Sequence, residues 1–268
     1  MQLGNAAIGQ YLPGSSLLHR ADPRLKITTL AIFAVALFFV GGIAGLLVMG
    51  AGLLLALALA RVPSRLIFRS IRPVLLLALI TFCFQLFLHG GAQLGHLGPL
   101  TLYRDGARNG GFLALRLVLL VLSGITLSLT TPPVMLTDAL GRLMAPLSRV
   151  RFPAYELALM MTIALRFIPA LLAEADRIIL AQAARGAGLG GGITGRARAL
   201  LPVLIPLFIL SFSNADELAQ AMESRCYRGG RGRTQRRRLE LGRVDALFAL
   251  LALLLVGAGI VIGRRSGF

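Results

Sequence analysis

Hydrophobic residues in this chain form several long runs that are separated by short charged stretches. A helix needs about 20 mostly apolar residues to cross a bilayer, and the longest run without a formal charge, residues 27–60, has 34 residues. That run is too long for one spanning helix, and glycines near position 42 break it, so we predict a tight hairpin of two spans. Three further runs each have the length of about one span. The predicted spans are 26–41, 44–61, 73–88, 111–130 and 246–263.

Residues 132–243 follow a different pattern, because charges recur at regular intervals within strongly apolar sequence. Residues 153–185 are typical of one long helix, since a proline suits a first helical turn and glycine follows the end. At about 100° per residue, most of its charged side chains fall on an arc of about 100°, and Asp176 lies outside it. We therefore predict an amphipathic helix with a wide apolar face, whose charged stripe consists of Glu156, Arg166, Glu174, Arg177 and Arg185. The simpler alternative is the solvated face of a helix that lies at the membrane surface.

A second helix is predicted over residues 197–227, with two prolines that kink its early part. The ends of the two helices are alike: the sequence Leu-Ala-Gln-Ala comes shortly before Arg185 and again before Arg225. An arginine at a helix C-terminus interacts favourably with the helix dipole, and its planar guanidinium matches a carboxylate. We interpret the two ends as recognition elements, and the alternative is that the arginines only cap their helices. The residues of the two tips are Ala184, Arg185, Gly186, Ser224, Arg225 and Cys226.

Composition narrows the class of protein. Apolar residues make up 56% of the chain and charged residues 15%, whereas an ordinary soluble domain has about 25% charged residues. Lys26 is the only lysine, so the chain has no P-loop of its own, since that motif needs a downstream lysine. Its two cysteines and three histidines are far apart, which indicates neither a disulfide framework nor a metal site. Because no paired catalytic carboxylates or nucleophile motif is present either, we expect a chain that is not an enzyme and needs no cofactor.

The distribution of arginines predicts how the chain lies in the membrane. Basic residues precede the first span and fill the predicted loop 61–72, so both segments and the N-terminus are expected to be cytoplasmic. The glycine-rich loop 89–110 has few charges and is expected outside. Arg116 lies near one end of the predicted fourth span, where its side chain would reach the headgroups. The first 25 residues lack the apolar core of a signal peptide, so the first span is expected to stay in the protein.

The net charge of +17 is concentrated in one part of the chain. Residues 142–243 contain 16 arginines against 7 acidic residues. Nucleic-acid binding is one interpretation of the basic run at the end of this segment. Contact with anionic membrane lipids just before the last span is the interpretation that we favour. The run consists of Arg231, Arg233, Arg236, Arg237 and Arg238.

Taken in order, these features resemble the transmembrane T component of energy-coupling factor (ECF) transporters, which are ABC-type importers of vitamins and of cobalt or nickel ions. The resemblance covers nearly the whole chain, through segments 11–15, 18–26, 137–147 and 164–169 and both arginine tips. One position departs from the family pattern: the second tip usually has Arg-Gly, and Cys226 takes the place of that glycine.

The resemblance implies an all-α integral membrane protein, with about five transmembrane helices and long amphipathic cytoplasmic coupling helices. It divides the chain into a membrane region at 1–131, coupling helices at 132–243 and a last transmembrane helix at 244–268. The chain would be a non-catalytic subunit in a bacterial or archaeal cytoplasmic (inner) membrane. It would link two ABC ATPases to one S component, a small membrane protein that binds a vitamin or a transition-metal ion.

The resemblance also assigns the tips a role. The tip residues around Arg185 and Arg225 would dock into the two ATPases, with the other stripe charges, Glu156, Arg166, Glu174 and Arg177, in support. The main alternative is a secondary transporter or channel that acts without ATPases. That class places ionisable groups at mid-membrane and often shows broken helices in paired halves.

Overall fold

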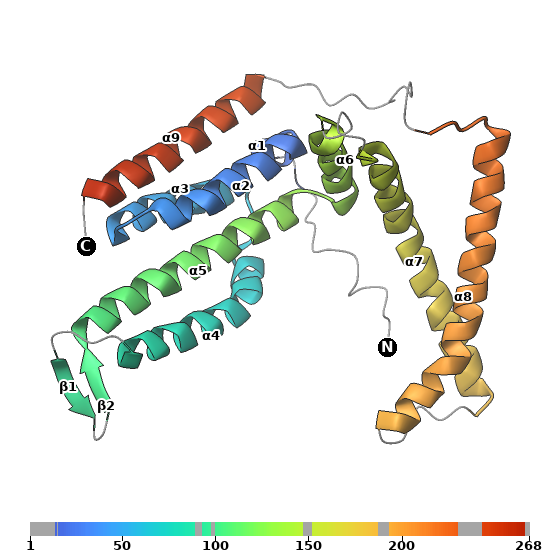
Figure 1. Ribbon diagram of the computed structural model, residues 1–268, viewed down its shortest axis with the longest axis horizontal. Helices are drawn as coiled ribbons and strands as arrows, with labels where there is room; N and C mark the ends of the chain where they lie inside the picture. Colours follow the sequence, from blue (N-terminus) through green and yellow to red (C-terminus); the bar gives the residue numbers. More distant parts are fainter. Residues whose placement is uncertain are drawn as a thin grey trace. The chain divides into compact units, whose positions relative to one another are not determined.

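The computed structural model describes residues 14, 16–88, 93–97, 100–146, 152–186, 193–229 and 243–265 (Figure 1). The predicted N-terminal segment 11–15 lies outside these ranges except for Gly14, and so does the basic run at 231–238. The chain divides into two compact units. We call Gln10–Leu136 with Arg237–Phe268 the N-terminal unit, and Thr137–Arg236 with Met1–Gly9 the central unit.

The predicted helical fold is confirmed, with one small hairpin added to it. The helices of the N-terminal unit are α1 (Leu17–Arg20), α2 (Pro23–Phe39), α3 (Ile43–Leu59), α4 (Ser64–Leu88), α5 (Arg104–Thr130) and α9 (Arg243–Arg265). The hairpin consists of β1 (Gln93–Leu97) and β2 (Leu100–Tyr103). Helix α6 (Pro133–Met144) runs across the boundary between the units, and α7 (Ala154–Ala184) and α8 (Ile193–Ser224) belong to the central unit.

Five helices of the described residues are long and apolar enough to cross a membrane, as expected for an integral membrane protein. Their apolar stretches are Ser64–Phe87, Arg104–Thr130, Ala154–Ala184, Leu200–Ser224 and Leu247–Arg265. The first, second and last of these correspond to predicted spans. The predicted hairpin of two spans is present as α2 and α3, which have 17 residues each and are therefore short for a span. Helices α7 and α8 are also long and apolar enough to span, because length and composition alone do not distinguish a span from an amphipathic helix with a wide apolar face.

The predicted loop 61–72 is mostly helical, because α4 begins at Ser64 and includes Pro73. Apolar residues before and after Pro73 pack against α5, which explains why the helix continues through the proline. Ile71 packs with Leu122 of α5 in one hydrophobic cluster, and Ile67 and Val74 lie against it. These three α4 residues are spaced by three or four positions, so they share one face of the helix. Their packing against α5 offsets the cost of a proline inside the helix.

The predicted loop 89–110 also contains regular structure. Strands β1 and β2 pair antiparallel, and α5 begins at Arg104 rather than at residue 111. Gly106 and Gly110 explain the early start, because the backbone of α4 passes close to both. A Cβ at Gly106 would lie 2.5 Å from the Gln85 carbonyl oxygen, and one at Gly110 would lie 3.1 Å from that of Phe82. These glycines let the first turns of α5 pack against the end of α4, so they belong to a helix contact and not to a loop.

The predicted place of Arg116 near one end of its span is wrong, and its side chain is bonded within the protein. Because α5 begins earlier, Arg116 lies in the middle of that helix. Its Nη2 donates a hydrogen bond of 3.0 Å to the carbonyl oxygen of Val40, and its guanidinium lies 4.5 Å from the ring centroid of Phe112. Val40 caps the C-terminus of α2, where the last carbonyls have no donor within their own helix. Arg116 therefore fastens the α2–α3 turn to α5.

Lys26 and two aspartates form a buried polar junction in the N-terminal unit. The Nζ of Lys26 donates to the Thr130 carbonyl oxygen at 3.3 Å and to Thr131 Oγ1 at 3.2 Å, at the C-terminus of α5. The backbone N–H of Asp22 donates to Asp245 Oδ1 at 2.8 Å, in the first turn of α9. All five residues are buried. The only lysine of the chain thus helps to hold the ends of three helices together, and its cation lies where the dipole of α5 favours it.

Candidate functional site

The first arginine tip is the C-terminus of α7. Arg185 is the C-cap residue, and its N–H donates to the carbonyl oxygens of Ala181 (3.2 Å) and Gln182 (3.1 Å). Gly186 follows with φ +81° and donates its N–H to the Ala183 carbonyl oxygen at 3.0 Å. A glycine adopts this left-handed conformation without the penalty that a Cβ brings. The helix therefore stops immediately after Arg185, as predicted.

The second arginine tip, at the C-terminus of α8, repeats this backbone geometry. Cys226 takes the position of Gly186 and has φ +56°, so a non-glycine residue occupies the left-handed region. Its N–H donates to the Glu223 carbonyl oxygen at 2.8 Å, and the N–H of Tyr227 donates to that of Met222 at 3.0 Å. This pair of bonds, from the first and second residues after the cap, is the Schellman motif of helix ends. The replacement of glycine by cysteine has therefore kept the shape of the tip, and the cysteine is held in a strained conformation.

All six predicted tip residues are exposed. The Ser224 hydroxyl donates to the carbonyl oxygen of Ala221 at 3.0 Å, within its own helix. Each tip therefore presents an exposed arginine at the negative end of a helix dipole, beside a tight turn. Such a tip is suited to insertion into a groove lined with carboxylates, which the guanidinium can bind through two parallel hydrogen bonds.

The two tips lie at opposite ends of the helix pair. Helices α7 and α8 contact each other and run antiparallel, and Figure 1 shows them apart toward the start of α7. A Cβ at Gly229, just beyond the second tip, would lie 3.8 Å from Glu156 Oε1 in the first turn of α7. Since α7 has 31 residues, it is about 46 Å long. The sequence indicates that the two tips are far apart. A short connection between two long helices makes them antiparallel, and their C-termini then lie at opposite ends of the pair.

The remaining stripe charges are distributed along α7 between these ends. Glu156 lies near Gly229, three residues beyond the second tip, which the stripe alone did not indicate. Glu174 and Arg177 form an ion pair of 3.3 Å one helical turn apart, and the Arg177 side chain is 78% exposed. An ion pair with that exposure contributes little to stability. Arg166 is also exposed, whereas Glu156 and Glu174 are half-buried.

Large apolar side chains on α7 and α8 are exposed as well. Leu180 on α7 is 70% exposed and Phe212 on α8 is 69% exposed. Ala154 is the only buried residue on the whole length of α7. Exposed apolar surface on this scale marks contact with a membrane or with another protein. Further large exposed side chains on the pair are Met160, Met161, Ile168, Leu204, Ile205, Phe208 and Ile209.

No group of three or more histidine, cysteine or acidic side chains in the described ranges could hold a metal ion. The two cysteines, Cys83 and Cys226, are free thiols and both are exposed. The chemistry that the described tips offer is therefore recognition through arginine, backbone shape and apolar surface.

Comparison with known proteins agrees with this description. Residues 14–236 match the family CbiQ, cobalt transport protein. The energy-coupling factor transporter transmembrane protein EcfT of Clostridium kluyveri is 46% identical over 93% of both chains. The EcfT proteins of Acidaminococcus fermentans and Bacillus subtilis are 46% and 39% identical, over 94% and 92% of this chain and 95% and 96% of their own lengths. The chain belongs to the cobalt transport protein family, together with the transmembrane EcfT components of bacterial energy-coupling factor transporters.

Proposed function

We propose that this chain couples two cytoplasmic ABC ATPases to one membrane-embedded S component, which binds a vitamin or a transition-metal ion. Each arginine tip docks into a groove on one ATPase. Movement of the ATPases on ATP binding then moves the ends of α7 and α8, and these helices transmit the motion to the S component. ATP hydrolysis belongs to the partners, in keeping with the absence of a P-loop in this sequence.

The observation that carries this proposal is the repeated tip. Two arginines at equivalent places in two helix ends, followed by residues with φ +81° and φ +56°, form two similar recognition elements. Two similar recognition elements suit two similar binding grooves, and two copies of one kind of ATPase domain provide such grooves. The separation of the tips along α7 supports two separate partners rather than one.

The exposed apolar surface of α7 and α8 supports the second part of the proposal. A solvated interfacial helix would need only one narrow apolar face, whereas both helices expose large side chains such as Leu180 and Phe212. An S component and the surrounding lipid would cover this surface. In this arrangement the N-terminus is on the cytoplasmic side, with the ATPases.

The test is charge reversal at both tips. In the double variant Arg185→Glu and Arg225→Glu, the guanidinium groups are lost and like charges meet any carboxylate in the sockets. Co-purification of the coexpressed ATPases with this chain should therefore be abolished. Arg265→Glu is the matched control, because Arg265 is also an exposed arginine but lies at the end of α9, outside both tips and the charged stripe, and it should leave the complex intact.

An intact complex of the double variant would overturn the docking role. Uptake by the chain and an S component in vesicles without any ATPase would instead support the secondary transporter. Arg116 does not favour that class, although it lies in the middle of α5, because it is bonded to the Val40 carbonyl oxygen and stacked on Phe112.

A further inference from the structure

The kink of α4 at Pro73 opens a pocket against α5. Proline has no N–H and its ring displaces the carbonyl four residues earlier, so it bends a helix. At the other end of α4, the helices touch through Gly106 and Gly110. The pocket has a volume of about 380 Å³, which is in the range of small-molecule sites. Its lining residues are Arg69, Ser70, Pro73, Ile125, Ser128 and Leu129.

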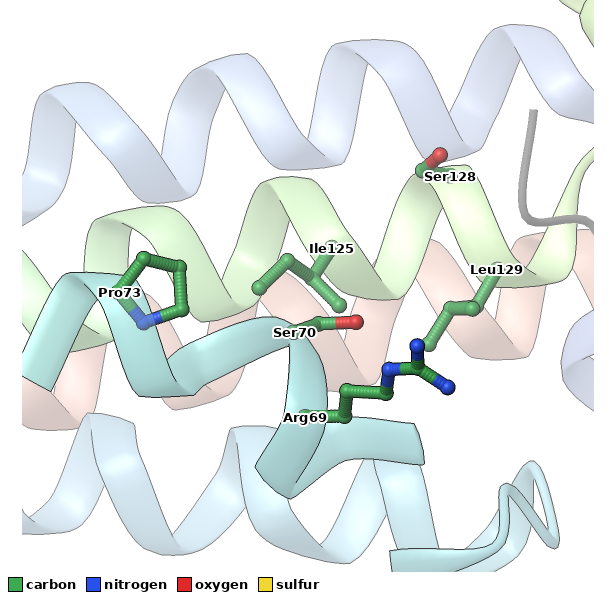
Figure 2. A pocket seen from close by; sticks show the side chains of 6 residues that line it. All are labelled: Arg69, Ser70, Pro73, Ile125, Ser128 and Leu129. Carbon is green, nitrogen blue, oxygen red and sulfur yellow. The ribbon is translucent and has the colours of Figure 1, made fainter. Parts of the chain in front are cut away.

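One part of this pocket is cationic and polar, and the other is apolar. In Figure 2 the guanidinium of Arg69 and the hydroxyl of Ser70 extend from α4 toward Ile125 and Leu129 on α5. Arg69 is exposed and Leu129 is 2% exposed, so the cation lies at the mouth and the apolar wall lies inside. A ligand that fits must have an anionic end and a hydrocarbon part next to it.

No carboxylate neutralises this part of the chain along its sequence. Residues 23–104 contain no aspartate or glutamate, and the only one on α5 is Asp105, at the far end of that helix. Arg65 and Arg72 lie four residues before and three after Arg69, so all three arginines share one exposed face of α4. Arg69 thus has two further arginines on its own helix face and no acidic residue on α4.

The pocket also lies near the ends of its two helices. It lies in the first part of α4 and the last part of α5, and both helices are long and apolar enough to span a bilayer. The ends of spans lie at the level of the lipid headgroups. Basic pockets between transmembrane helices at this level suit anionic lipids.

We propose that this pocket binds one anionic phospholipid such as phosphatidylglycerol. The lipid phosphate accepts charge-assisted hydrogen bonds from Arg69, and the start of an acyl chain lies along Ile125 and Leu129. Arg65 and Arg72 attract the headgroup through the general field without contacting the bound phosphate. The site is formed by residues of α4 and α5 and includes none of the arginine-tip residues.

Native mass spectrometry of the full chain in detergent, titrated with dioleoylphosphatidylglycerol, tests the proposal. Arg69→Gln should weaken the tightest lipid-binding event about tenfold, the amount expected for loss of a hydrogen bond between charged groups. Arg65→Gln is the matched control, since it removes the same charge from the same exposed face outside the pocket lining. It should change binding by about twofold or less, as a screened surface charge does.

Two further measurements distinguish a lipid from a free phosphate. Ile125→Trp fills the apolar wall without changing the charge, and it should also weaken phosphatidylglycerol binding about tenfold. Millimolar inorganic phosphate should not displace the lipid, and dioleoylphosphatidylcholine should bind more weakly because its headgroup has no net charge. Equal losses in Arg69→Gln and Arg65→Gln, displacement by phosphate, or equal binding of the two lipids would each overturn the proposal. Circular dichroism and size-exclusion elution verify that each variant is folded.

Discussion

The strained cysteine at the second arginine tip leads to a quantitative prediction. Cys226 has φ +56°, in the place where the first tip has Gly186 with φ +81°. The left-handed conformation costs a residue with a Cβ about 1–2 kcal/mol. A glycine at this position avoids that cost, but it loses about 0.5–1 kcal/mol more conformational entropy on folding, so the net gain is smaller. Cys226→Gly should therefore stabilise the last turn of α8 by about 0.5–1 kcal/mol.

The reverse change at the first tip provides the mirror experiment. A Cβ added at Gly186 meets nothing within 4 Å, so Gly186→Ala alters the backbone energy and creates no clash. We expect it to destabilise the last turn of α7 by a similar amount. Gly124→Ala is the matched control, because Gly124 is exposed inside α5 and its Cβ also meets nothing within 4 Å. There alanine should stabilise, since glycine is the poorer helix former.

Hydrogen exchange at the tips measures these effects locally. The N–H groups of Cys226 and Tyr227 donate to the carbonyl oxygens of Glu223 and Met222, and both bonds break when the last turn opens. With intrinsic rates corrected for the new side chain, a gain of about 0.5–1 kcal/mol slows exchange of the Tyr227 amide about two- to fivefold. Gly186→Ala should speed exchange in the last turn of α7 by the same factor.

The outcome that contradicts this reasoning is specific. If Cys226→Gly leaves the Tyr227 exchange rate unchanged or raises it, the left-handed cysteine is not the source of strain at this tip. A second readout links the geometry to docking. Cys226→Val should weaken ATPase binding, because a β-branched residue disfavours the left-handed region most and distorts the tip. Cys226→Gly should bind at least as well as the unmodified chain.

Two further predictions concern packing in the N-terminal unit. Gly45→Ala on α3 should lower stability in detergent by about 1–3 kcal/mol, since its Cβ would overlap the carbonyl oxygen of Gly259 on α9. Gly257→Ala, also on α9, is the control, because a Cβ there meets nothing within 4 Å and should not lower stability. Equal melting temperatures of the two variants would contradict a close α3–α9 contact. Lys26→Met should lower stability by about 1–3 kcal/mol in the same melting assay, because the buried Thr130 carbonyl oxygen loses the hydrogen bond from Lys26. An unchanged melting temperature would show that this bond does not stabilise the junction.

The bounds of α7 and α8 were predictable because their signals are local. Charge spacing, a leading proline and trailing glycines predict a helix over 153–185, one residue longer at each end than Ala154–Ala184. The range 197–227 is shifted by three or four residues from Ile193–Ser224. All six tip residues are exposed in the structure, and their docking role stays a prediction.

The features that local signals miss depend on contacts between distant residues. Pro73 marks a helix start when α4 is considered alone, and it is tolerated inside the helix because Ile71 packs against α5. Arg116 falls near the end of a span only if α5 is taken to begin at residue 111, whereas α5 begins at Arg104. Lys26 and Thr130 are 104 residues apart, so no periodicity relates them. Predicting such positions requires knowledge of which helices are neighbours.

The opposed ends of α7 and α8 also determine how the two arginine tips act together. Tips separated by about 46 Å cannot enter one groove, so in the proposed complex each tip would bind its own partner and the two contacts would reinforce each other through the helix pair. Binding at one tip raises the effective concentration of the other near its socket. Loss of Arg185 alone should therefore leave a weakened complex held by Arg225, and loss of both should remove it. A single substitution that abolished assembly would indicate that the two tips serve one composite socket, which the antiparallel arrangement of the helices opposes.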